Sequence, residues 1–144
     1  MTTRFVVIDT NVVASGLITD QLDSPPARIV DAMLRGTFPF LLSLDLLAEY
    51  RRVLLRPTIQ RLHGLTSPEV DTILTKVTSN GLVKEPKGTE VKGMDPGDLH
   101  IRQLLESVPN AMLVTGDQAL RKFLIKTTPV FSPQEFISES LKQD

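Results

Sequence analysis

The chain has 144 residues, enough for one domain that buries its own hydrophobic core, and it contains no cysteine, which excludes disulfide bonds and thiolate metal sites. Its formal net charge of −1 gives no overall attraction to nucleic acid. The first apolar run, over residues 5–8, is too short for a signal peptide, and no later run could span a bilayer. We therefore expect a cytoplasmic protein that does not enter membranes.

The N-terminal half alternates apolar runs with stretches of helical periodicity. Residues 4–8 predict a short buried strand, because the unbroken apolar run over 5–8 contains β-branched and aromatic residues. Residues 24–35 predict a helix, because two prolines fit its first turn and a glycine follows it. Residues 38–42 predict a second strand. A helix over 43–55 follows, with a serine as its N-cap, and Pro57 stops it.

The C-terminal half continues this alternation. The capping-box sequence Thr66-Ser67-Pro68-Glu69 begins a helix that Gly81 ends. Residues 85–97 are rich in proline, glycine and charge and are expected to form a loop. The remaining predicted elements are a helix over 98–108, a strand over 111–114, a helix over 118–125, a strand over 130–131 and a terminal helix from 132 onward. This alternation predicts an α/β fold in which helices cover both faces of a parallel sheet.

Four acidic residues fall where such a fold would gather them: Asp9, Glu49, Asp98 and Asp117. Asp9 and Asp117 each follow a predicted strand, and ligands of open parallel sheets bind outside the carboxyl ends of the strands. Glu49 and Asp98 lie in predicted helices, and Asp95 is an alternative to Asp98. Clustered carboxylates raise one another's pKa or require a cation. Because hard ions prefer oxygen ligands, we expect Mg²⁺ or Mn²⁺ here.

Each carboxylate also has a purely structural interpretation. Asp9 and Asp117 are suited to cap the helical turns that follow them. Glu49 could form an exposed ion pair with Arg52, which would contribute little to stability. Asp98 could cap its own helix. The case for a functional cluster therefore rests on all four residues together.

Basic residues gather in local patches. Arg52 and Arg56 follow Glu49 by three and seven residues, so the three side chains share one helix face. Together with Arg121, these arginines are candidates to bind a polyanion, and the alternative is that they belong to solvated helix faces. His100 has no ligand spacing, and we expect it to face solvent.

Four short motifs follow one another along nearly the whole chain: Val7-Ile8-Asp9-Thr10-Asn11-Val12, Leu46-Leu47-Ala48-Glu49-Tyr50, Asp95-Pro96-Gly97-Asp98 and Leu113-Val114-Thr115-Gly116-Asp117. In order and spacing they resemble the PIN domain. The resemblance is closest to the bacterial and archaeal PIN proteins of toxin–antitoxin systems, which are related to VapC-like toxins.

This resemblance implies a single PIN-like domain over 1–144, a three-layer α/β/α sandwich around a short parallel sheet. It also implies a ribonuclease that depends on Mg²⁺ or Mn²⁺, with the four acidic residues as its catalytic metal ligands. Asn11 and Thr115 match polar residues that support the site, to which Thr10 adds a hydroxyl, and the three arginines would contact RNA. Toxins of this type are inhibited by a cognate antitoxin and commonly form homodimers.

Two positions depart from the family pattern. Relatives often carry acidic residues where this chain has Gly97 and Ala119, so we expect at least one bound ion and leave a second open. The alternative function is a non-catalytic RNA- or protein-binding module with a degenerate site. A phosphatase with Asp9 as nucleophile would need an acid two residues later, where the chain has Asn11.

Overall fold

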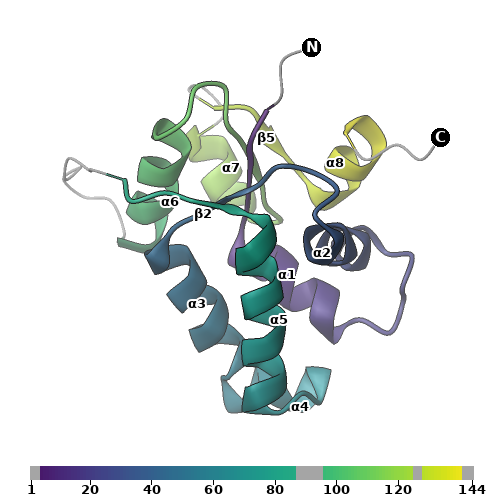
Figure 1. Ribbon diagram of the computed structural model, residues 1–144. Helices are drawn as coiled ribbons and strands as arrows, with labels where there is room; N and C mark the ends of the chain where they lie inside the picture. Colours follow the sequence, from purple (N-terminus) through teal and green to yellow (C-terminus); the bar gives the residue numbers. More distant parts are fainter. Residues whose placement is uncertain (1–3, 87–95, 125–127, 141–144) are drawn as a thin grey trace.

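A computed structural model describes residues 4–86, 96–124 and 128–140 (Figure 1). Most of the loop predicted over 85–97, including Asp95, lies outside the described residues. The elements are, in chain order, β1 (Val6–Ile8), α1 (Thr10–Ile18), α2 (Pro25–Arg35), β2 (Leu41–Leu42), α3 (Leu44–Leu54), α4 (Pro57–His63), α5 (Ser67–Asn80), β3 (Leu82–Val83), α6 (Pro96–Glu106), β4 (Met112–Val114), α7 (Gln118–Leu124), β5 (Val130–Phe131) and α8 (Pro133–Glu139).

The strands are short and pair in parallel. β1 lies beside β4 and β4 beside β5, while β2 pairs with β3. A bridge between Val6 and Phe40 connects β1 to the segment before β2. Every residue of β1 and β4 is buried, although successive side chains point to opposite faces, so helices must cover both faces. The predicted α/β sandwich around a short parallel sheet is confirmed.

Serine and threonine caps set the helix starts. The side chains of Ser24, Ser43, Thr66 and Ser132 each accept a hydrogen bond from a backbone N–H in the first turn. The capping boxes at Thr66 and Ser132 are complete. Gly36 ends α2 with φ of 67°, a left-handed conformation that glycine adopts without strain. The predicted helices are confirmed.

Three elements were not predicted. α1 follows β1 directly, and its buried residues include three in succession, which gives no amphipathic stripe. α4 contains no buried residue, and both residues of β3 are exposed. The strand expected over 38–42 is reduced to Leu41–Leu42, because Pro39 has no N–H to donate to a ladder.

The core fixes the elements around the carboxyl end of β1. α3 contacts α6, and α6 contacts β1. Tyr50 of α3 is fully buried, and its hydroxyl donates to the Ile8 carbonyl oxygen at 2.5 Å. This bond ties the helix that carries Glu49 to the strand that ends at Asp9. Within the described ranges, no helix is both long and apolar enough to cross a membrane.

Candidate active site

A cavity of about 500 Å³ opens at the carboxyl ends of β1 and β4. It is lined by all four predicted acidic residues, Asp9, Glu49, Asp98 and Asp117, and is called the acidic cavity below. Thr10, Asn11 and Arg56 also line it. They come from the end of β1, from α3, from α6 and from the segment after β4. The register pairs Ile8 with Val114, so the chain leaves both strands at the same edge of the sheet.

Asp9 is the most enclosed of these carboxylates, with only 9% of its surface exposed. Its Oδ1 accepts from the Thr10 backbone N–H at 2.9 Å. Its Oδ2 accepts from the Thr115 hydroxyl at 2.6 Å and from the Asn11 amide at 3.3 Å. The Asn11 carbonyl oxygen in turn accepts from the Gly116 N–H at 3.3 Å. The three residues expected to support the site thus surround Asp9 and connect the two strand ends.

The electrostatic environment of Asp9 disfavours its ionised form. Burial raises its pKa above the ordinary value, and hydrogen bonds from Thr115 and Thr10 oppose this shift. The negative charges of Glu49 and Asp117 raise the pKa further. A cation bound in the acidic cavity would therefore stabilise the ionised form of Asp9.

Asp117 lies at the exposed rim of the cavity. Its Oδ1 accepts from the backbone N–H groups of Ala119 at 2.9 Å and Leu120 at 3.1 Å, so it caps α7. Its own N–H donates to the Thr115 hydroxyl at 3.0 Å. The capping interpretation is correct for this carboxylate and also for Asp9, which is the N-cap of α1. Capping leaves both carboxylates on the lining of the cavity.

Glu49 is held at both of its carboxylate oxygens. The Thr10 hydroxyl donates to Oε2, and the His100 Nε2 lies 3.2 Å from Oε1. Arg52 is more distant, 3.9 Å from Oε1, and its side chain is largely exposed. The ion pair with Arg52 is therefore present, but the Glu49 side chain is only 18% exposed, so the expectation that Glu49 is exposed is wrong.

The expectation that His100 faces solvent is also wrong. Its side chain is 13% exposed and contacts Glu49. The apolar stripe of α6 identified its core-facing residues correctly, at Ile101, Leu104 and Leu105. That stripe carries no information on α3, which packs against α6 and brings Glu49 to His100.

Asp98 lies in the first turn of α6, which begins at Pro96. It is therefore inside the helix and does not precede it as an N-cap would. Arg56 lines the acidic cavity, and Arg52 lines an adjoining hollow of about 300 Å³, to which Glu49 also contributes.

The remaining candidate for polyanion binding, Arg121, is not among the residues that line the acidic cavity. Its guanidinium donates to both carboxylate oxygens of Glu135, at 2.7 and 3.3 Å. This pair holds the pKa of Glu135 down to about 2, helped by the Ser132 backbone N–H. The ion pair connects α7 to α8.

The donor chemistry of the acidic cavity fits Mg²⁺ or Mn²⁺, which take carboxylate oxygens as ligands. Across residues 4–86, 96–124 and 128–140, no three acidic or histidine side chains are close enough to hold one ion.

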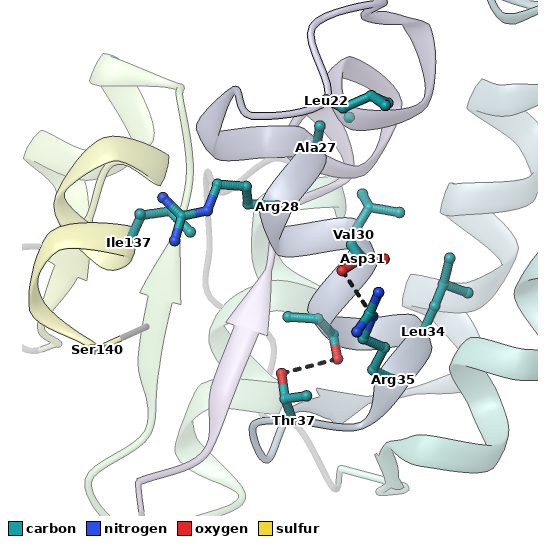
Figure 2. A pocket seen from close by; sticks show the side chains of 12 residues that line it. Leu22, Ala27, Arg28, Val30, Asp31, Leu34, Arg35, Thr37, Ile137 and Ser140 are labelled. Carbon is teal, nitrogen blue, oxygen red and sulfur yellow. Dashed lines mark hydrogen bonds and ion pairs between the residues drawn. The ribbon is translucent and has the colours of Figure 1, made fainter. Parts of the chain in front are cut away.

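A larger hollow, of about 730 Å³, lies over α2 and extends toward α8 (Figure 2). Figure 2 shows Arg28 extending from α2 toward Ile137. Asp31 is the acidic residue among the described residues that line this hollow, and it pairs with Arg35 at 3.0 Å. Because acidic residues do not cluster there, size alone does not make this hollow the better candidate.

A sequence profile of the PIN domain matches residues 5–119. The matched range runs from the start of β1 into α7 and includes all four acidic residues of the cavity. No curated protein matches the chain. PIN domains are typically nucleases and generally use divalent metals. The extent of the profile match shows that the chain belongs to the PIN domain family.

Proposed function

We propose that this PIN domain protein is an endoribonuclease that depends on Mg²⁺ or Mn²⁺. The observation that carries the proposal is the acidic cavity, where carboxylates from four separate segments line about 500 Å³ at the end of the parallel sheet. Family membership supports nuclease chemistry. The restriction to RNA is supported by the resemblance of the four motifs to those of ribonuclease toxins.

The reaction adds water across one P–O bond of the RNA backbone and requires no covalent protein intermediate. The residues that would hold the ion are Asp9, Glu49, Asp98 and Asp117. When bound, the ion would lower the pKa of the attacking water and stabilise negative charge on the phosphate. Thr115 and Asn11 keep the Asp9 carboxylate in one orientation. Arg56 lines the same cavity and is placed to donate to a phosphate oxygen.

The test is Mn²⁺ titration by calorimetry, together with cleavage of mixed RNA in the presence and absence of EDTA. The variant is Asp9→Asn, and the matched control is Asp31→Asn, which removes an exposed carboxylate from α2. We expect the wild type and Asp31→Asn to bind Mn²⁺ and cut RNA, and Asp9→Asn to do neither. A folded wild-type protein that binds no Mn²⁺ would overturn the proposal.

RNA contact by the arginines is tested by the salt dependence of binding in EDTA. In a plot of the logarithm of the RNA-binding constant against the logarithm of the salt concentration, each lost phosphate contact should make the negative slope shallower by about 0.7 for single-stranded RNA. Arg56→Gln and Arg52→Gln report on the two neighbouring hollows, and Arg121→Gln reports on the residue paired with Glu135. An unchanged slope in a variant excludes a phosphate contact for that arginine.

We further propose that the protein is the toxin of a type II toxin–antitoxin system, forms a homodimer and is inhibited by a cognate antitoxin. The motif resemblance supports this role. Induced expression in a bacterial host should arrest growth for the wild type and not for Asp9→Asn. Light scattering should give the mass of two chains. Normal growth while RNA cleavage is retained in vitro would separate the toxin role from the nuclease activity.

The second candidate function is a non-catalytic RNA-binding module. It is favoured because no three acidic or histidine side chains among the described residues are close enough to hold one ion, and because Gly97 and Ala119 stand where relatives often carry acids. This alternative predicts RNA binding without cleavage at any Mn²⁺ concentration. The calorimetry and cleavage experiments therefore distinguish the two functions.

A further inference from the structure

His100 occupies a position that the proposed chemistry does not yet explain. It lies on α6 and lines the adjoining hollow of about 300 Å³, together with Glu49 and Arg52. Its Nε2 is 3.2 Å from Glu49 Oε1, and its side chain is 13% exposed. Its Nδ1 is buried and finds no hydrogen-bond partner among the described residues.

The chemistry of this contact fixes the arrangement of hydrogens on the ring. An ionised carboxylate only accepts hydrogen bonds, so the His100 Nε2 must carry the hydrogen and donate it to Glu49. Buried polar atoms without partners are rare, and a leucine at this position would bury none. Packing of α6 therefore does not require a histidine at position 100, whereas the bond to Glu49 does.

The contact with His100 restricts the orientation of the Glu49 side chain. It contributes to the lining of both the acidic cavity and the adjoining hollow, so open space lies on either side of it. Thr10, at the start of α1, donates to one oxygen, and His100 of α6 donates to the other. Donors from two different elements thus fix a long side chain that could otherwise turn away from the acidic cavity.

We propose that His100 is a positioning residue that holds the Glu49 carboxylate in place as a ligand for Mg²⁺ or Mn²⁺. The inference rests on the proposed function and deepens it. Residues that hydrogen-bond to metal ligands orient them and raise metal affinity without touching the ion. His100 acts in this way through Glu49 alone.

The first measurement is Mn²⁺ affinity by calorimetry. His100→Leu should weaken binding about 10-fold, in the range typical of lost outer-sphere partners. His100→Gln should restore most of the affinity, since its amide nitrogen can donate from near the Nε2 position. In a Glu49→Ala background, His100→Leu should have no further effect. Equal losses with and without Glu49 would show a merely structural role and overturn the proposal, as would wild-type affinity in His100→Leu.

The second measurement needs no metal. The chain has two histidines, and nitrogen NMR at fixed pH reports which ring nitrogen of each carries the hydrogen. His100 should carry it on Nε2, and Glu49→Ala should change that resonance. His63 is an internal control, because its Nε2 lies 2.8 Å from the Leu54 carbonyl oxygen and its Nδ1 accepts from the Leu65 N–H, away from Glu49.

The two measurements separate failure of the inference from failure of the proposed function. A wild-type protein that binds no Mn²⁺ overturns the proposed function and the role of His100 in metal binding. The NMR result then still decides whether His100 holds Glu49. A His100 resonance that Glu49→Ala leaves unchanged overturns the positioning role, whatever the metal affinity.

Discussion

The two aspartates that follow β1 and β4 share a sequence pattern and lie in different environments. Asp9 is 9% exposed, and both of its oxygens accept hydrogen bonds from residues at the two strand ends. Asp117 is exposed, and its Oδ1 caps α7. The same strand–aspartate–helix pattern thus gives one enclosed carboxylate and one at the rim.

The difference arises from what surrounds each strand end. Beyond Asp9 the chain continues at once into α1, whose first residue, Thr10, is buried and contacts Glu49. Beyond Val114 the chain passes through Thr115 and Gly116 before Asp117, which moves this carboxylate outward. A ligand in the acidic cavity would therefore meet Asp9 at its base and Asp117 at its edge.

The largest expected effect separates these two aspartates in catalysis. Asp9→Asn should lower the rate of RNA cleavage by roughly 100-fold or more, because it removes a charge from the base of the cavity where the ion would bind. Asp117→Asn should cost less, since the asparagine can still cap α7. Single-turnover cleavage at saturating Mn²⁺ measures both. An equal loss in the two variants would contradict the distinction between base and rim.

A second substitution acts on both strand ends at once. Thr115 is buried, donates to Asp9 and accepts from the Asp117 N–H. Thr115→Val keeps the shape and removes the hydroxyl, which should destabilise the fold by about 1–3 kcal/mol. Cleavage should fall by roughly 10- to 100-fold, as expected when a ligand loses its orienting partner.

Thr115→Ser is the matched control for this substitution, because it retains the hydroxyl and loses only a methyl group. Urea unfolding and cleavage rates are measured on both variants. If Thr115→Val cleaves RNA as fast as Thr115→Ser, the bond between Thr115 and Asp9 does not orient the carboxylate.

Local patterns predicted the parts of the site that depend on local sequence. An apolar run followed closely by aspartate marked the strands that precede Asp9 and Asp117, and a serine and a threonine cap marked the starts of α3 and α5. The environment of Asp9 could not be predicted, because the hydrogen bond from Thr115 and the nearby negative charge of Glu49 come from residues that are distant in sequence. The same limit applies to Glu49 and His100, which are 51 residues apart.

The missed helix α1 has a different cause. Val12, Val13 and Ala14 are buried in succession, so the segment shows no alternation between an apolar and a polar face. Propensity does not compensate, since β-branched residues are only moderate helix formers. Its position immediately after Asp9 also left no separate turn to mark where β1 ends and the helix begins.

The third prediction concerns stability without metal. The folded pKa of Asp9 is raised by burial, so folding disfavours its ionised form. Below pH 3.8, the ordinary value, Asp9 is protonated in both states and the folded protein does not bear this cost. As pH rises through the folded pKa, the wild type should lose stability relative to Asp9→Asn, whose side chain stays neutral.

Chemical unfolding of the wild type and Asp9→Asn in EDTA, from pH 3 to 8, measures this difference. Asp31→Asn controls for the general effect of removing a carboxylate from the surface. Adding Mn²⁺ should reverse the order at neutral pH, because an ion bound to the folded wild type stabilises it. A difference that does not grow as pH rises would contradict the electrostatic cost of Asp9.

The smallest effect on stability is expected for the ion pair between Arg121 of α7 and Glu135. The pKa of Glu135 is held down to about 2, mainly by the Arg121 hydrogen bond, so the pair stabilises the fold above pH 4.5 and loses that contribution as pH falls toward 2. This direction is opposite to that of Asp9. Both side chains are partly exposed, so Arg121→Gln should cost less than about 1 kcal/mol at pH 7.

Urea unfolding of Arg121→Gln between pH 2 and 7 measures this contribution, with Arg35→Gln as the control from an exposed pair on α2. At pH 7 Arg121→Gln should be less stable than the wild type, and this difference should shrink as pH falls. Asp9→Asn should instead be more stable at pH 7 than a wild type that bears the cost of the ionised carboxylate, and that advantage should also disappear as pH falls. If the stability differences of Asp9→Asn and Arg121→Gln from the wild type change with pH in opposite directions, burial governs the charge of Asp9 and ion pairing governs the contact between α7 and α8. A common slope would mean that one electrostatic environment covers the whole edge of the sheet.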